Sequence, residues 1–362
     1  MSRRRGRAAT LAACIAAILA AAPPGAAPLA ADEGRGFALG GSIGERAYAS
    51  WAGTGGLDPA DIAYGSATGL ELGIEAEGGG SGAATARARA VGDLLLRSGA
   101  AAAGGETLAA RVRELGVALD LGFASLEGGR VIVNWSRGSP WSPVDLFADY
   151  DRSGPTALRL GADALVLRAP VGATGAVEAV AAPSLPSASL AEGRYALRAS
   201  GYALGVDAGA LCARDGATGD WLLGADFKAD LEAGIYGEAL CALSEGNDAR
   251  YRAALGADWS AALGEGGGKL LLQAEYCYDG MPFPAARGAP DSHNAYASLA
   301  WAGDRSTASL GASYSWPSGA AGATLVAALD AAPGASLVAY ARASRRSAAD
   351  YAEAGLSLEL RF

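Results

Sequence analysis

Hydrophobic and polar residues alternate at every second position through much of the chain. From Thr307 to Trp316, alanine, leucine, tyrosine and tryptophan occupy the even positions, while threonine, serine and glycine occupy the odd ones. The same period recurs from Leu70 to Glu77, from Trp221 to Glu232 and from Leu270 to Asp279. Successive side chains of a β-strand point to opposite faces, so this pattern predicts strands with one apolar and one polar face.

Eighteen segments fit this description, and most are near the length of about 10 residues that a tilted strand needs to cross a bilayer. An unclear break near Val206 and an unclear turn near Asp230 leave sixteen strands as an alternative. The predicted strands are 37–49, 67–77, 84–96, 112–126, 130–136, 157–168, 174–182, 194–205, 207–214, 219–229, 232–242, 251–263, 269–278, 294–302, 306–316, 321–329, 336–343 and 351–362.

The connections between these segments alternate in length. The long ones are 50–66, 97–111, 137–156, 183–193, 243–250, 279–293 and 344–350, and the short ones include 78–82, 127–129, 264–268 and 302–304. Two connections, 215–218 and 317–320, are short where long ones are expected. Transmembrane barrels have short periplasmic turns, longer external loops and an even number of strands. The predicted fold is therefore an all-β, transmembrane, antiparallel up-and-down β-barrel of about 16–18 strands.

Soluble all-β folds explain these features less well. A sandwich has no reason to alternate its loop lengths, a solenoid would show a fixed repeat period, and a lipocalin-like barrel uses about eight strands. The low content of large side chains also speaks against a soluble core, since 51% of residues are hydrophobic but only 7% are aromatic, and 53 are glycine.

The N-terminus has the features of a secretory signal peptide. Arg3, Arg4, Arg5 and Arg7 precede an apolar run, and small residues before Asp32 offer a cleavage site. We therefore expect a signal peptide at 1–31 and one barrel domain at 32–362. A retained membrane anchor is the alternative, and lipidation of Cys14 is a minor one, because Cys14 lies inside the apolar run rather than after it.

Charge and cysteine content narrow the function classes. The formal net charge is −9, and loss of the four N-terminal arginines makes the mature chain more acidic still. This argues against nucleic-acid binding, which needs a basic surface, and mildly favours cationic solutes if the charge faces a channel. The spacing of Cys212, Cys241 and Cys277 suggests no metal site, so we expect small apolar strand residues there and no cofactor.

One predicted pair of strands carries opposite charges on its polar face. Glu71, Glu75 and Glu77 lie on one strand, and Arg87 and Arg89 lie on the next. Oppositely charged side chains on neighbouring strands can pair across a sheet. We expect these five residues to form part of a wet lumen wall, with an exposed face of a soluble sheet as the alternative.

The segment from 128 to 155 has the most distinctive sequence. It resembles a segment of porin-like bacterial outer-membrane barrels, in which a Gly-Arg strand precedes a Trp-Gly-x-Gly-x-x-Trp-x-Pro-x-Asp sequence. The matching residues are Gly129, Arg130, Trp135, Gly138, Trp141, Pro143 and Asp145, whereas Val131, Asn134 and Ser136 depart from the commonest form. The resemblance covers about twenty residues and implies a barrel class without identifying a solute.

Prolines and tryptophans can stiffen the loop 137–156 and let it pack by burial. The functional hypothesis is that this loop folds into the barrel and narrows the pore, with Arg137, Trp141, Asp145 and Asp149 near the constriction. The alternative is an ordinary packed external loop.

The last strand resembles the closing strand of outer-membrane barrels. It alternates up to a terminal Phe362, and in that group such a strand is read by the barrel assembly machinery. Gly355, Leu358, Leu360 and Phe362 are the residues of the expected assembly signal.

Evidence for an enzyme is thin. His293 is the sole histidine and stands beside Ser292. Adjacent loop residues do not make a catalytic triad, because a base needs a positioned nucleophile and an orienting group. We therefore expect no enzymatic activity, and a barrel hydrolase ranks last among the hypotheses.

Together these features predict an outer-membrane, porin-like channel for diffusion of small hydrophilic solutes. Its partners would be the lipid bilayer, the assembly machinery and the solutes, and self-association into a homo-oligomer stays open. The alternatives are a non-channel outer-membrane barrel with a surface or adhesive role and a periplasmic β-rich binding protein.

Overall fold

The computed structural model describes residues 35–53, 61–79, 85–99, 108–138, 140–151, 157–184, 189–246, 249–264, 268–281, 293–316, 318–345 and 350–362. The expected signal peptide with Cys14, and Ser292, lie outside these residues. No helix in the described part is long and apolar enough to cross a membrane.

Eighteen strands form one antiparallel sheet, and two short strands form a separate hairpin. The strands of the sheet are β1 (Arg35–Gly53), β2 (Ala63–Gly79), β3 (Thr85–Gly99), β4 (Leu108–Asp120), β5 (Ser125–Val131), β8 (Ala162–Val171), β9 (Gly175–Ser184), β10 (Ser189–Ala203), β11 (Val206–Asp215), β12 (Asp220–Asp230), β13 (Gly234–Leu243), β14 (Arg250–Ala262), β15 (Lys269–Asp279), β16 (His293–Ala302), β17 (Ser306–Trp316), β18 (Ala321–Ala332), β19 (Ala335–Arg345) and β20 (Asp350–Arg361). The hairpin consists of β6 (Asp149–Asp151) and β7 (Leu158–Leu160).

Each strand of the sheet pairs with its neighbours in sequence, apart from the insertion of the hairpin between β5 and β8, and β20 pairs with β1. The sheet is therefore a closed barrel without an exposed edge. At the closure, Phe362 and Gly41 exchange two backbone hydrogen bonds of 3.0 Å. The predicted fold class, an all-β antiparallel up-and-down barrel, is confirmed. The strand number is eighteen, the larger of the two expected values.

Register and exposure assign the two faces of the wall. Leu211, Leu222 and Leu240 belong to a buried cluster inside the barrel, whereas the alternate residues Trp221 and Leu223 are 51% and 45% exposed. Directly paired residues of neighbouring strands share a face, so the strand register extends this assignment around the ring. Leu356, Leu358 and Leu360 lie on the outer face, and Ser357, Glu359 and Arg361 lie on the inner face.

Two strand boundaries differ from the prediction. The turn expected at 127–129 lies instead at 121–124, so the predicted strands 112–126 and 130–136 become β4 and β5. Gly122 has a φ of +79°, and its amide donates a 2.8 Å hydrogen bond to Asp120 Oδ1, which stabilises the turn. Gly129 lies within β5, where a Cβ would stand 2.2 Å from the carbonyl oxygen of Leu115.

The predicted strand 157–168 is likewise two elements, because β7 belongs to the inner hairpin and β8 to the barrel wall.

The connections alternate in length less regularly than expected. Several strands run further than predicted, so that only residues 185–188 separate β9 from β10 and 346–349 separate β19 from β20. We call the end of the barrel that carries the connections 54–62, 100–107, 132–161 and 280–292 the long-loop rim, and the other end the short-turn rim.

Candidate channel constriction

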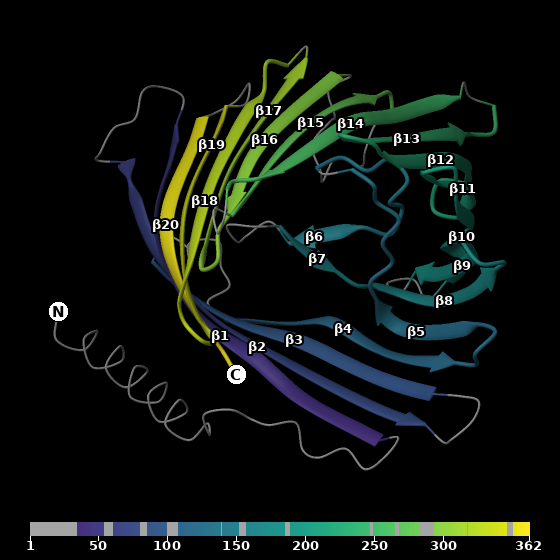
Figure 1. Cartoon of the computed structure of the whole chain (residues 1–362), viewed down its shortest axis with the longest axis horizontal. Helices are drawn as coiled ribbons and strands as arrows, with labels where there is room; N and C mark the ends of the chain where they lie inside the picture. Colours follow the sequence, from purple (N-terminus) through teal and green to yellow (C-terminus); the bar gives the residue numbers. More distant parts are fainter. Residues whose placement is uncertain are drawn as a thin grey trace.

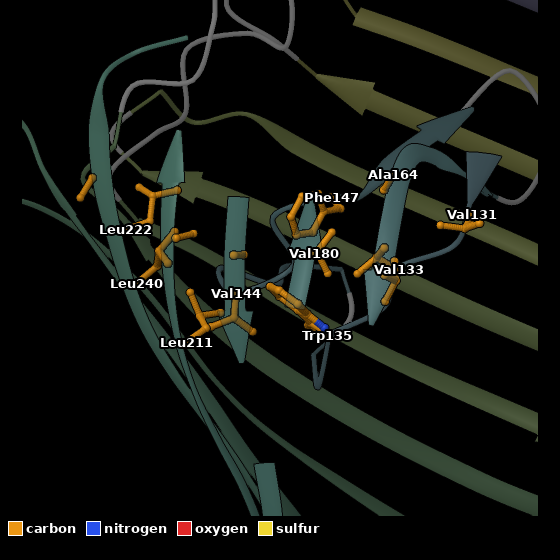
Figure 2. Close-up of a cluster of buried hydrophobic side chains, with 14 of the residues drawn as sticks. Val131, Val133, Trp135, Val144, Phe147, Ala164, Val180, Leu211, Leu222 and Leu240 are labelled. Atoms are coloured by element: carbon orange, nitrogen blue, oxygen red, sulfur yellow. The ribbon is translucent and has the colours of Figure 1, made fainter. Parts of the chain in front are cut away.

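The described residues of the connection between β5 and β8, which are 132–138, 140–151 and 157–161, lie inside the ring of strands instead of over its rim. Figure 1 shows its hairpin, β6 and β7, surrounded by the barrel wall. An apolar cluster accounts for this position (Figure 2). Val133, Trp135, Val144 and Phe147 of the connection are buried against inward-facing residues of β8 to β13. The wall members are Ala164, Val166, Val180, Ala196, Leu211, Ala213, Leu222, Leu240 and Ala242.

Trp135 is at the centre of this cluster. Its ring meets Phe147 edge to face, with centroids 5.3 Å apart, and its indole N–H donates to Glu178 on β9. The apolar body of the tryptophan is buried while its polar atom has a partner, which satisfies both parts of the side chain.

Glu238 on β13 binds the backbone of the connection. It is 3% exposed, and its carboxylate accepts hydrogen bonds from the amides of Arg137, Gly138 (2.9 Å) and Val144 (3.3 Å) and from the Ser142 hydroxyl (2.6 Å). Buried carboxylates are tolerated when donors satisfy their oxygens, and four donors do so here. Glu238 therefore fixes the path of residues 137–144 against the wall.

Arg137 adds a second anchor on the same wall. It donates to both oxygens of Asp207 on β11 (2.6 and 2.8 Å) and through Nε to Asp226 on β12 (2.8 Å). The Asp226 side chain is fully buried and also pairs with Arg198 of β10 at 2.8 Å. Burial alone would lower the pKa of Arg137, but the hydrogen bonds and charges of Asp207 and Asp226 raise it above the ordinary value. The arginine is thus held as a cation in a fork of carboxylates.

A third carboxylate, Glu275 of β15, accepts the Trp141 amide at 3.0 Å and the Tyr236 hydroxyl at 2.9 Å. Gly138 passes so close that a Cβ there would lie 2.5 Å from the Trp141 carbonyl oxygen and 2.9 Å from Glu275 Oε2. The connection therefore needs glycine at 138 for its close approach to the wall.

The hairpin end of the connection contacts the other side of the lumen. Asp151 of β6 pairs with Arg111 of β4 at 2.8 Å, and the Gly161 amide donates to the Arg113 carbonyl at 3.1 Å. Within the connection, Arg159 of β7 donates to both oxygens of Asp145 at 2.6 Å. The segment is thereby attached to β11–β15 at one end and to β4 at the other.

The four residues that the sequence places near a constriction all lie in this connection, in different settings. Arg137 and Asp145 are buried in ion pairs, with 17% and 2% of their side chains exposed. Trp141 packs edge to face against Tyr296 of β16, with centroids 6.3 Å apart, and Asp149 is exposed at the start of β6. Residues 139 and 152–156 of the predicted loop lie outside the described residues.

The five charged residues expected in the lumen wall all lie on the inner face. Register puts Glu75 opposite Arg89 and Glu77 opposite Arg87. Arg87 lies 3.3 Å from Glu75 and 3.6 Å from Glu77, whereas Arg89 pairs with Glu114 of β4 at 3.2 Å.

Glu71 pairs with Arg113, a residue that the sequence analysis did not single out. Arg113 of β4 is 8% exposed and bridges Glu71 at 2.7 Å and Asp93 at 3.2 Å. A β-bulge, marked by the register shift between Val91 and Gly92, places Arg113 and Glu114 on the inner face although they are adjacent in sequence. Strict alternation would have put one of the two charges on the outer face.

The carboxylates that hold the connection also escaped the sequence analysis. Asp207, Asp226, Glu238 and Glu275 each occupy an inward position of an alternating strand, which their period-two pattern does indicate. The pattern cannot show that a distant loop covers them. The sequence does carry a signal for a covering loop. Large apolar residues such as Val166, Leu211 and Leu222 occupy inward positions of neighbouring strands, where a wet lumen would predict polar residues.

His293 lies on the outer face at the long-loop rim. Its Nδ1 is 2.6 Å from the Tyr276 hydroxyl, and its ring centroid lies 5.5 Å from that of Tyr278. Among the described residues its neighbours form an aromatic group of the kind found at membrane interfaces.

Comparisons with known proteins find likeness in structure alone. No protein-family model and no curated protein sequence matches the chain. Similar solved structures include Acinetobacter baumannii OccAB4 (TM-score 0.61, 8% identity, covering 89% of this chain and 98% of that one). They also include Pseudomonas aeruginosa OpdK with vanillate (TM-score 0.59, 12% identity, 90% and 98%) and the outer-membrane protein OprD of Pseudomonas aeruginosa (TM-score 0.59, 13% identity, 90% and 93%). The closed barrel with its inner connection is therefore a porin-like fold.

Proposed function

We propose that the chain is a channel of the bacterial outer membrane through which small hydrophilic solutes diffuse. The observation that carries this proposal is a closed barrel of eighteen strands whose inner face is charged and whose outer face is apolar. Barrels of roughly 16–18 strands are wide enough to enclose an aqueous channel. The exposed outer leucines, such as Leu356 and Leu358, suit contact with lipid.

The anchored connection limits the width of this channel. Arg137 and Asp145 hold its shape through their ion pairs, Trp141 braces it against β16, and Asp149 presents a carboxylate to the lumen. A loop held by several charge-assisted hydrogen bonds is rigid enough to set a constant limiting diameter. The inner-face charges of β2 to β4 line the remaining passage.

In this proposal the long-loop rim faces the exterior and the short-turn rim faces the periplasm. The chain reaches the membrane after removal of residues 1–31, and the assembly machinery reads Gly355, Leu358, Leu360 and Phe362. Vanillate is a small aromatic carboxylate, and its presence in the OpdK structure makes it the first solute to try, beside a neutral sugar of similar size.

Planar-bilayer recordings test both parts of the proposal. The wild type is compared with a variant in which a short Gly-Ser linker replaces residues 137–156. We expect steady channels from the wild type and a larger single-channel conductance from the variant. Absence of conductance from barrels that show heat-modifiable migration on a gel would overturn the channel. Equal conductance of the two proteins would overturn the role of the connection alone.

A further inference from the structure

The inner face of β17 carries hydroxyl groups along its whole length. Its inward residues are Thr307, Ser309, Gly311, Ser313 and Ser315. We call the threonine and the three serines the hydroxyl row. Thr307 is exposed and the serines are partly exposed, so water in the lumen reaches the row. Among the eighteen described strands of the sheet, β16 and β17 are the two without a charged residue on the inner face.

The hydroxyl row borders the space that the connection leaves open. The described contacts of the connection extend from Arg111 on β4, through the apolar cluster on β8 to β13, to Glu275 on β15 and Tyr296 on β16. The strand that follows β16 in the ring is β17. A solute that passes the connection on this side therefore moves along the hydroxyl row.

Gly311 interrupts the row and makes room for an aromatic ring. A Cβ at position 311 would stand 2.9 Å from the Tyr296 hydroxyl oxygen and 3.2 Å from Tyr296 Cε2. The Tyr296 side chain, whose register partner is Ser313, therefore leans across the glycine that separates Ser309 from Ser313. Hydroxyl groups thus precede and follow the ring along β17.

Trp141 of the connection brings a second ring to the same place. The Trp141 and Tyr296 rings meet edge to face at 85°, with centroids 6.3 Å apart, and both side chains are partly exposed. The Trp141 amide is fixed by its 3.0 Å hydrogen bond to Glu275, so the position of this aromatic pair is set by the wall. The pair lies where the connection meets the wall beside the open part of the lumen.

From this arrangement we infer that the aromatic pair and the hydroxyls of Ser309 and Ser313 form a binding site for neutral saccharides inside the channel. A hydroxyl both donates and accepts, so the row can exchange hydrogen bonds with successive hydroxyls of a moving sugar. An aromatic ring offers apolar surface to the C–H face of a sugar ring, and a few placed polar groups then fix its orientation. A strand without charge offers no ion pair to a charged solute. This inference rests on the proposed function and names its solute class.

Current interruptions in planar bilayers test the site. Glucose and sucrose are added to wild-type channels, and the charged solutes lysine and vanillate are added for comparison. We expect the sugars to interrupt the current at lower concentrations than the charged solutes. Tyr296→Leu should weaken the apparent sugar affinity about tenfold, whereas Tyr296→Phe, which keeps the ring, should retain most of it.

Two further variants separate sugar binding from the shape of the pore. The double variant Ser309→Ala and Ser313→Ala should weaken the apparent sugar affinity several-fold and leave the conductance without sugar unchanged, because it removes two oxygen atoms and no packing contact of the connection. Tyr314→Leu changes an exposed tyrosine on the outer face of the same strand and should behave as wild type.

Conducting channels that sugars do not interrupt would overturn the saccharide site and keep the proposed function. Wild-type sugar affinity in Tyr296→Leu, or stronger interruption by lysine or vanillate, would overturn the site as well. Tryptophan fluorescence of the detergent-solubilised barrel, titrated with sucrose, measures binding without conduction. A sucrose response that Tyr296→Leu abolishes, in barrels that do not conduct, would refute the proposed function but keep the site, whereas loss of both signals would refute both.

Discussion

The Ser142 hydroxyl donates to Glu238 Oε2 at 2.6 Å and so joins a loop residue to a carboxylate 96 positions further along the chain. The same carboxylate accepts three backbone amides of the connection. Glu238 therefore holds residues 137–144 largely through their backbone, beside the side-chain anchors that Trp135 and Arg137 of the same segment provide.

Glu238→Ala should release this segment. It leaves three amides and one hydroxyl without their acceptor, and each unsatisfied buried group costs about 1–3 kcal/mol. We expect a larger and noisier single-channel conductance in planar bilayers. Asp350→Ala, which removes an outer-face carboxylate at the start of β20, is the matched control and should leave the recordings unchanged. Quiet wild-type currents from Glu238→Ala would contradict the anchoring role.

Arg137→Lys should loosen the segment although it keeps the charge. A lysine cannot reproduce the paired hydrogen bonds to Asp207 together with the bond to Asp226. Loss of charge-assisted hydrogen bonds at this largely buried position should cost about 1.5–3 kcal/mol. Limited proteolysis of intact membranes should cut the variant within 132–161 faster than the wild type. The cutting rate of the turns at the short-turn rim serves as the internal control, and equal rates within 132–161 would refute this role.

Gly138→Ala tests the close approach of the connection to the wall. The added Cβ would stand 2.5 Å from the Trp141 carbonyl oxygen, so the backbone must move away from Glu275. We expect a larger single-channel conductance than that of the wild type, as for Glu238→Ala. Gly78→Ala, where no atom lies within 4 Å of the added Cβ, should behave as wild type. The idea fails if the two alanine variants conduct alike.

Arg113→Ala should change ion selectivity. Arg113 neutralises Glu71 and Asp93 on the inner face, and its loss leaves both carboxylates to attract cations. Reversal potentials under a salt gradient should shift towards cation preference. Arg345→Ala removes an outer-face arginine at the rim and should not shift them. An unchanged reversal potential in Arg113→Ala would show that these charges lie off the conducting path.

Deletion of Phe362 should lower the amount of assembled barrel more than it alters the finished channel. Its backbone exchanges two 3.0 Å hydrogen bonds with Gly41 where β20 meets β1, and a Cβ at position 41 would lie 3.0 Å from its ring. We expect less heat-modifiable protein in the membrane fraction but wild-type conductance per channel. Wild-type membrane levels of the deletion variant would argue against an assembly role.

The sequence by itself determined the strands and their faces. Alternation has a period of two whatever the strand pairs with, so the inner charges of β2 and β3 and the outer leucines of β20 are readable without a structure. The number of strands followed only as sixteen or eighteen, because the breaks near Val206 and Asp230 are unclear in the sequence. Local turn chemistry was less certain. The glycines at 128 and 129 resemble a turn, but one of them serves a close backbone approach within β5.

The tertiary structure alone decided how distant segments meet. The bulge that turns both Arg113 and Glu114 inward depends on pairing with β3, and alternation within β4 gives no sign of it. The docking of residues 132–161 depends on carboxylates that lie up to 134 positions away in sequence, as Trp141 and Glu275 show. Glu45 shows the same division, since its alternation with Leu39 and Ile43 indicates its face, whereas only the register with β2 and β20 shows that Thr68 and Leu358 lie beside it. Period-two patterns specify which side of a strand each residue takes, whereas closure and register specify what each side faces.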